Sequence, residues 1–109
     1  MQLVPDTSVV VDGRLSARVE AGDFADATVV VPEAVVGELE AQANDGRATG
    51  WEGLAELKRL VALEADGVID VEYVGRRPDA LEKRDAGEGE IDALIRDLAA
   101  ERGATLLTS

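Results

Sequence analysis

Residues 1–8, Met-Gln-Leu-Val-Pro-Asp-Thr-Ser, place a short apolar stretch directly before an acidic residue and two hydroxyl residues. Met1 to Pro5 predicts a first β-strand, which Asp6-Thr7-Ser8 brings to an end. The apolar residues that follow, Val9 to Val11, run into Asp12-Gly13, a pair typical of a turn. The beginning of the chain therefore predicts a strand whose carboxyl end carries a carboxylate.

Strand and helix signals alternate along the rest of the chain. Thr28 to Val31 is a β-branched run typical of a buried strand, and Val68 to Val74 alternates apolar with acidic residues, as an edge strand does. Helices are predicted at 15–21 and at 33–44. A third is predicted from the N-cap Thr49 to Asp66 and carries Leu54, Leu57, Leu60 and Val61, and a last one begins at Glu88 and is stopped by Gly103. Residues 105–108 predict a last strand, and 76–84 a loop.

This order predicts an α/β fold, a small parallel sheet of about four strands flanked by helices. A chain of 109 residues has room for a single domain, so we expect residues 1–109 to form one unit. Ligands of such sheets bind beyond the carboxyl ends of the strands. The residues that follow each strand are therefore the first candidates for a functional site.

The composition limits the side chains that could take part in catalysis. The sequence contains no cysteine and no histidine, so thiolate and imidazole catalysis are excluded, and carboxylates, hydroxyls or metal ions must do any chemical work. No apolar run approaches the roughly 20 residues of a membrane span, and the N-terminus lacks the pattern of a signal peptide. A cytoplasmic location is the simplest interpretation.

The chain is strongly acidic. It has 23 acidic and 11 basic residues, for a net charge of −12, which should repel nucleic acid at low salt. Bound Mg²⁺ or Mn²⁺ would bridge carboxylate and phosphate, and a very salty cytoplasm would screen the repulsion. The acidic, lysine-poor composition is typical of halophilic proteins. Charge alone decides neither for nor against an RNA substrate.

Three carboxylates from separate stretches are expected to meet at one rim of the sheet. Asp6 follows the first strand, Glu38 lies in the helix at 33–44, and Asp92 lies early in the helix that begins near Glu88. Hard divalent cations prefer such oxygen ligands, and a cation held this way activates water without His or Cys. The composition and the positions of these residues therefore permit a catalytic, metal-binding site at Asp6, Glu38 and Asp92.

Each acid also has a simpler interpretation. Asp6 would serve as a turn or cap residue, Glu38 as a solvated surface residue, and Asp92 as the partner of Arg96 one helical turn away. Glu88 and Glu90 would favour the N-terminus of their helix electrostatically. The spacing of the acids alone leaves these alternatives open.

The longer stretches of sequence around these acids resemble the motifs of a known family. Pro5-Asp6-Thr7-Ser8-Val9-Val10-Val11-Asp12-Gly13-Arg14 resembles the opening motif of PIN domains, especially those fused to a TRAM domain or to a PilT-like ATPase. Val31 to Leu39 resembles their second motif, and Asp92 to Ala99 with Ala104 to Ser109 resembles the helix of the third acid and the strand after it. The likeness covers nearly the whole chain in order.

The resemblance implies a metal-dependent ribonuclease with two Mg²⁺ or Mn²⁺ ions held by Asp6, Glu38 and Asp92. Thr7 and Ser8 would lie beside the metal or its waters, and Glu90 and Thr108 would be accessory. Asp12 matches an acid of the subgroup, for which a turn role is the simpler interpretation. The family places a fourth acid directly after the position of Ser109, so we expect the domain to be incomplete at its C-terminus and the activity of the 109-residue chain to suffer.

Basic and aromatic residues are candidates for contact with RNA. The basic set comprises Arg14, Arg47, Arg76, Arg77, Lys83 and Arg84, for which solubility and local ion pairing are the simpler interpretation. Trp51 and Tyr73 would stack on bases or, more simply, pack against neighbouring residues.

Other functions compete with the nuclease hypothesis. The domain would instead be an assembly or regulatory module of a larger protein, with a fused ATPase, KH or TRAM domain, and self-association into a homo-oligomer fits that role. A toxin of a toxin–antitoxin pair shares the same broad family. A phospho-acceptor receiver domain is disfavoured, because Tyr73-Val74-Gly75 follows the third strand where an Asp is needed, and no lysine follows Lys83.

Overall fold

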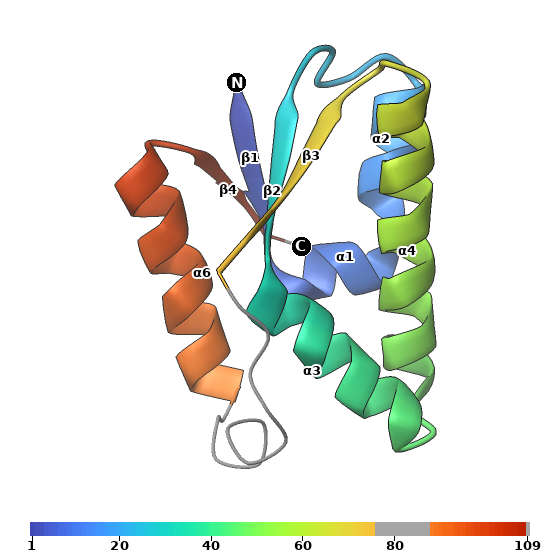
Figure 1. The fold of residues 1–109 in the computed structure, drawn as a ribbon, viewed down its shortest axis with the longest axis vertical. Helices are drawn as coiled ribbons and strands as arrows, with labels where there is room; N and C mark the ends of the chain where they lie inside the picture. The colour runs from blue at the N-terminus through green and yellow to red at the C-terminus, as the bar shows by residue number, and fades with distance from the viewer. Residues whose placement is uncertain (76–87, 109) are drawn as a thin grey trace.

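The computed structural model describes residues 1–75 and 88–108. Helices and strands alternate through these residues, with short connections (Figure 1). In chain order the elements are β1 (Gln2–Pro5), α1 (Thr7–Asp12), α2 (Arg14–Glu20), β2 (Thr28–Pro32), α3 (Glu33–Asn44), α4 (Ala48–Ala65), β3 (Asp70–Val74), α6 (Glu88–Arg102) and β4 (Thr105–Leu107).

The strands form one parallel sheet in the order β3-β2-β1-β4. Pro5 pairs with Leu107 and Pro32 pairs with Val74, so the carboxyl ends of neighbouring strands lie at the same edge. Helices α1 to α4 cover one face of the sheet and α6 covers the other (Figure 1). The predicted α/β fold, a parallel sheet between helical layers, is confirmed.

The core forms because the central strands are apolar on both faces. Leu3 and Val4 in β1 and Val29, Val30 and Val31 in β2 are completely buried. A parallel strand covered by helices on both sides is expected to be apolar without alternation. Completely buried or nearly buried side chains from the helices, among them Val10, Leu39, Leu60 and Ile95, close the two faces.

The segment after β1 differs from its prediction. The structure places the six-residue helix α1 at Thr7–Asp12, where the sequence indicated an apolar extension and a turn. Asp6 caps this helix, and Gly13 ends it in the left-handed conformation at φ 71°. The helix is too short for a 3.6-residue period to be visible in three consecutive valines.

The start of α4 also differs from its prediction. The residue before the helix is Arg47, without a side-chain cap, and the Thr49 hydroxyl donates instead to Gln42 Oε1 at 2.6 Å. A Cβ on Gly50 would lie 2.2 Å from the backbone nitrogen of Ala43, so this glycine lets α3 and α4 approach backbone to backbone. Val61, expected with Leu57 and Leu60 among the apolar residues that this helix carries, is 41% exposed.

The third strand lies at the sheet edge, as predicted, and begins at Asp70 rather than at Val68. The predicted loop at 76–84 lies outside the described residues, which resume at α6. Among the helices of the described part, none combines the length and apolar character that crossing a membrane requires.

An ion pair links β3 to α6 and gives a first testable prediction. Arg102 Nη2 lies 2.8 Å from Glu72 Oε1 and Nη1 lies 3.0 Å from Oε2. The hydrogen bonds from Arg102 lower the pKa of Glu72 below its ordinary value of 4.5, and those to Glu72 raise the pKa of Arg102. A carboxyl group whose pKa is lower in the folded protein than in the unfolded chain stabilises the fold at pH values above its pKa in the unfolded chain. This stabilisation is lost as the pH falls through its pKa in the folded protein.

We therefore expect the difference in unfolding free energy between wild type and Glu72→Gln to stay constant from pH 8 to about pH 5 and to shrink at lower pH. The pair is exposed, so the difference should be small and should fall further at high salt. Urea unfolding at several pH values measures it, and Glu52→Gln, at an exposed position on α4, controls for the loss of one negative charge. A difference that grows on acidification would contradict this role for the pair.

Candidate metal centre at the strand ends

Asp6 stands at the junction between β1 and α1. Its Oδ1 accepts hydrogen bonds from the Val9 amide at 2.9 Å and from Ser8 Oγ at 2.7 Å, and its own amide donates to the Leu107 carbonyl at 2.9 Å. The cap interpretation of Asp6 is thus confirmed. A carboxylate offers about four acceptor positions, so the cap leaves capacity for a cation.

Glu38 lies in the second turn of α3, half-buried rather than solvated on the surface. Thr7, the first residue of α1, donates from Oγ1 to Glu38 Oε2 at 3.4 Å. Because Thr7 directly follows Asp6, this contact brings the acid after β1 and the acid of the helix after β2 to the same edge of the sheet. Thr7 is therefore well placed to orient Glu38.

Gln42 and Thr49 extend this network, and sequence reasoning did not single them out for it. Gln42 is buried one turn after Glu38 and donates from Nε2 to Glu38 Oε1 at 3.4 Å, while the Thr49 hydroxyl donates to Gln42 Oε1 at 2.6 Å. The bond from Thr49 requires the amide oxygen to face α4, which turns the amide nitrogen toward Glu38. The i,i+4 spacing of Glu38 and Gln42 was the available signal.

Asp92 lies on α6, the helix that covers the opposite face of the sheet, and its side chain is exposed. Asp92 and Arg96, both within the described part of α6, form no ion pair, so the simpler interpretation of Asp92 is not observed. Among residues 1–75 and 88–108, no three acidic side chains gather closely enough to hold a metal ion. The structure thus links the Asp6 junction to Glu38, and the convergence with Asp92 stays a prediction.

The remaining candidates are spread over several elements. Glu90 is exposed near the start of α6, and Thr108 is exposed directly after β4. Arg14 is exposed at the start of α2, whereas Arg76, Arg77, Lys83 and Arg84 lie outside the described residues. Trp51 is 62% exposed and Tyr73 is 40% exposed, so neither side chain is buried in the core.

The oxygen ligands at this edge of the sheet suit a hard divalent cation. Asp6 and Glu38 supply carboxylate oxygens, and Thr7 and Ser8 supply hydroxyls beside them. Mg²⁺ is usually held by one or two carboxylates together with water and substrate phosphate, because it keeps several of its waters. Asp6 and Glu38 are the carboxylates that a site of this kind would use.

Comparison with known proteins agrees with the fold. The family model of the PIN domain matches residues 3–109. The chain is 50% identical over 104 residues to an uncharacterized KH and PIN-domain containing protein of Methanocaldococcus jannaschii. The match covers 95% of this chain and 16% of that protein, so the chain spans about a sixth of the length of this relative.

A solved structure shows a similar arrangement. It is described as a domain of a functionally unknown protein from Methanocaldococcus jannaschii and is 48% identical in sequence to this chain. The superposition has a TM-score of 0.90 and covers 99% of this chain and 77% of the other.

Proposed function

The chain belongs to the PIN domain family, which is generally a family of nucleases, and from this premise we propose that it is a metal-dependent endoribonuclease domain. The observation that carries the proposal is the contact between Thr7 and Glu38, which ties the carboxylates that follow β1 and β2 to one edge. Without His or Cys in the sequence, carboxylates are the groups left to organise phosphodiester hydrolysis.

In this proposal Asp6, Glu38 and Asp92 hold the cation, with Glu90 and Thr108 accessory to it. When bound, Mg²⁺ or Mn²⁺, as one ion or two, would lower the pKa of a water molecule and offset charge on the scissile phosphate. Thr7 and Gln42 orient the Glu38 carboxylate through its two oxygens, and the cap bonds fix Asp6. Loss of a hydrogen bond that orients a metal-binding side chain typically lowers the metal affinity by about 10–100-fold.

RNA is the proposed substrate because of the domains that one relative combines in its chain. The name of the Methanocaldococcus protein joins a PIN domain to a KH domain, and KH domains clamp single-stranded nucleic acid. We propose that this chain also acts next to a KH domain, in the cytoplasm. Of the fused domains expected from the sequence, the KH domain is the one that this comparison supports, and ATPase and TRAM domains find no support in it.

A second candidate is an assembly module with little cleavage. It is favoured by the exposed position of Asp92 and by the absence of a three-acid group from the described residues. Light scattering combined with metal titration separates the two functions. A defined oligomer without carboxylate-dependent metal uptake would favour assembly, and uptake by a monomer would favour the nuclease.

The test of the nuclease is metal-dependent cleavage. The protein in its natural length is expected to cut a labelled single-stranded RNA with Mn²⁺ and not with EDTA. Asp92→Asn should slow cleavage at least about 10-fold if α6 contributes the third acid, since loss of a ligand should cost no less than loss of an outer contact. Asp97→Asn, at an exposed position on the same helix, is the matched control.

Two outcomes would count against this scheme. Cleavage that persists in EDTA would exclude the metal mechanism. Equal rates for Asp92→Asn and Asp97→Asn would remove Asp92 from the site and leave Asp6 and Glu38 as the proposed metal-binding acids.

A further inference from the structure

A small pocket lies beside the Asp6 junction, between α1, α2 and the end of β4. Its volume is about 130 Å³. Pockets that hold whole drug-sized ligands measure roughly 300–1,000 Å³, so this one suits a single flat ring system. Val9 and Leu107 form part of its wall, and both bond to Asp6, through the Val9 amide and the Leu107 carbonyl. The pocket therefore adjoins the candidate metal centre.

The wall away from Asp6 is aromatic and basic. The Arg18 guanidinium lies 5.3 Å from the centroid of the Phe24 ring, and its Nε donates to Asp23 at 3.0 Å. A guanidinium has five N–H donors, and the bond to Asp23 uses one of them. Arg14 lines the same pocket as a second cation, and Asp12 adds a carboxylate. The pocket thus offers flat stacking surfaces, donors and an acceptor together.

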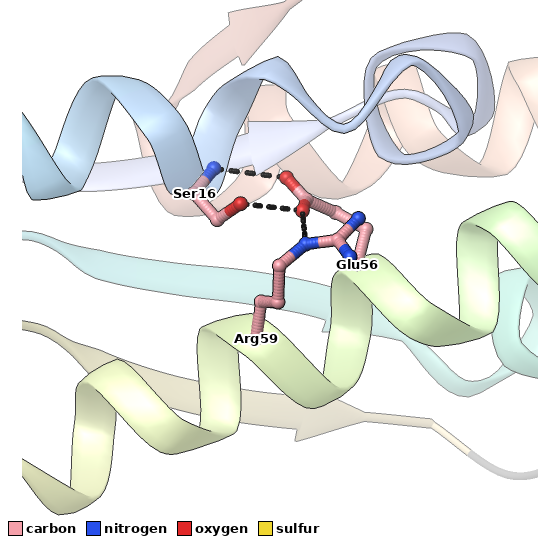
Figure 2. A network of polar contacts seen from close by, with 3 residues as sticks. All are labelled: Ser16, Glu56 and Arg59. Atoms are coloured by element: carbon pink, nitrogen blue, oxygen red, sulfur yellow. Dashed lines mark hydrogen bonds and ion pairs between the residues drawn. The ribbon is translucent and has the colours of Figure 1, made fainter.

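Helix α2, which carries Arg14 and Arg18 of this wall, is held in place by a residue of α4. Glu56 on α4 is completely buried and accepts from the amide of Ser16 at 2.8 Å and from its hydroxyl at 2.6 Å (Figure 2). These bonds fix the first turn of α2, between Arg14 and Arg18. Phe24 has a left-handed backbone at φ 57°, a conformation that a non-glycine residue keeps only where its surroundings determine it. The backbone on this side of the pocket is therefore preformed.

We propose that this pocket receives one unpaired base of an RNA substrate, with guanine as the best fit. The proposal rests on the proposed nuclease function, because it places the base next to the phosphate that is cut. A phosphate would be repelled by Asp12 and Asp23, whereas a base would stack on the Arg18–Phe24 pair and would both donate and accept hydrogen bonds. Guanine presents O6 and N7 to an arginine and two adjacent N–H donors to a carboxylate, so it satisfies Arg14 and Asp12 together.

The test is binding in EDTA, where no metal contributes. Amide NMR signals are followed while guanosine, adenosine, cytidine or uridine monophosphate is added. Guanosine monophosphate is expected to shift the signals of Val9, Arg18 and Phe24 and to bind at least about fivefold more tightly than the others, because one bidentate base contact discriminates by about 1–3 kcal/mol. No shift at these residues, or equal affinity for all four nucleotides, would overturn the proposal.

A variant pair locates the site. Arg18→Gln is expected to weaken guanosine monophosphate binding at least about fivefold, while Lys58→Gln, which removes the same charge at an exposed position on α4, should change it less than twofold. Equal weakening by both variants would show a general charge effect and would overturn the proposal. Amide spectra of the variants, compared with wild type, verify that the fold is retained.

A second binding measurement distinguishes a site for an RNA base from a site for a free nucleotide. Fluorescein-labelled UUGUU is expected to bind in EDTA more tightly than UUAUU, as measured by anisotropy. Binding of the mononucleotide without a preference between the pentamers would identify a free-nucleotide site and overturn the assignment to RNA. Because these measurements contain no metal, base binding without metal-dependent cleavage would contradict the nuclease alone, and cleavage without base binding would contradict the pocket alone.

Discussion

Replacing Asp6 by asparagine is expected to lower Mn²⁺-dependent RNA cleavage at least about 100-fold while the fold persists. Contacts that only orient a metal ligand are worth about 10–100-fold, and a ligand itself should be worth no less. The cap should survive, because an asparagine oxygen accepts the same bonds that Asp6 Oδ1 now accepts from Val9 and Ser8. Asparagine and aspartate are about equally good N-caps. Asp6→Asn therefore separates the charge of residue 6 from its structural role.

The measurement has three parts. Cleavage rates are compared for wild type and Asp6→Asn at natural chain length, urea unfolding gives the stability of both without metal, and melting temperatures are recorded with and without Mn²⁺. We expect the unfolding free energy without metal to differ by less than about 1 kcal/mol, the size of a charge at a helix N-terminus. Mn²⁺ at 100 times its Kd should stabilise wild type by about 2.7 kcal/mol and the variant far less.

Asp6→Ala provides the contrast, because it removes both the cap and the charge. It should lose activity as Asp6→Asn does and in addition lose about 1 kcal/mol of stability. Equal cleavage by wild type and Asp6→Asn would end the nuclease proposal. Equal stabilisation of both by Mn²⁺ would remove Asp6 from the metal site.

The sheet was predictable because its strands depend on local composition. The runs around Leu3 and Val30 are apolar without alternation, and a parallel strand that is buried on both faces needs this pattern. Helix α1 was not predictable in the same way. Its six residues are too few to display a helical period, and what stabilises it is the cap from Asp6 together with packing against α4, a helix more than 30 residues later.

The candidate site was predictable in its types of residue and less so in its geometry. Asp6 and Glu38 follow successive parallel strands, so topology alone brings them to one edge. The position of Asp92 is harder to predict, because α6 follows a strand at the far edge of the sheet and crosses the opposite face. The bonds from Thr49 to Gln42 and from Gln42 to Glu38 depend on the crossing of α3 and α4, which Gly50 determines.

Glu56 shows most clearly where sequence reasoning ends. It lies on the buried face of α4, four residues before Leu60, where an apolar residue would be expected. Its partner Ser16 lies 40 residues away in the chain. The amide of Ser16 is one of the unpaired N–H groups of the first turn of α2, and Gly13, the N-cap of that helix, offers no side chain. Glu56 therefore caps α2 from another helix.

Replacing Glu56 by alanine is expected to destabilise the domain by about 2–5 kcal/mol, because buried hydrogen bonds and buried side-chain volume are lost together. The Ser16 amide and hydroxyl would lose their acceptor in a site that excludes water, and the removed side chain would leave a cavity. The same carboxylate binds Arg59 Nε at 2.9 Å (Figure 2), so that guanidinium would lose a partner as well. Domains of this size have only about 5–15 kcal/mol of total stability.

Two further variants make the measurement specific. Glu56→Gln keeps the shape and one acceptor oxygen but turns an amide N–H₂ toward a donor, so we expect a loss of about 1–3 kcal/mol, smaller than that of Glu56→Ala. Glu52→Ala, at an exposed position one turn earlier on α4, should change stability by less than about 0.5 kcal/mol. Urea midpoints for the three variants should therefore fall in the order Glu52→Ala, Glu56→Gln, Glu56→Ala. If Glu56→Ala costs no more than Glu52→Ala, the buried carboxylate does not hold α2, and the preformed backbone on this side of the pocket needs another cause.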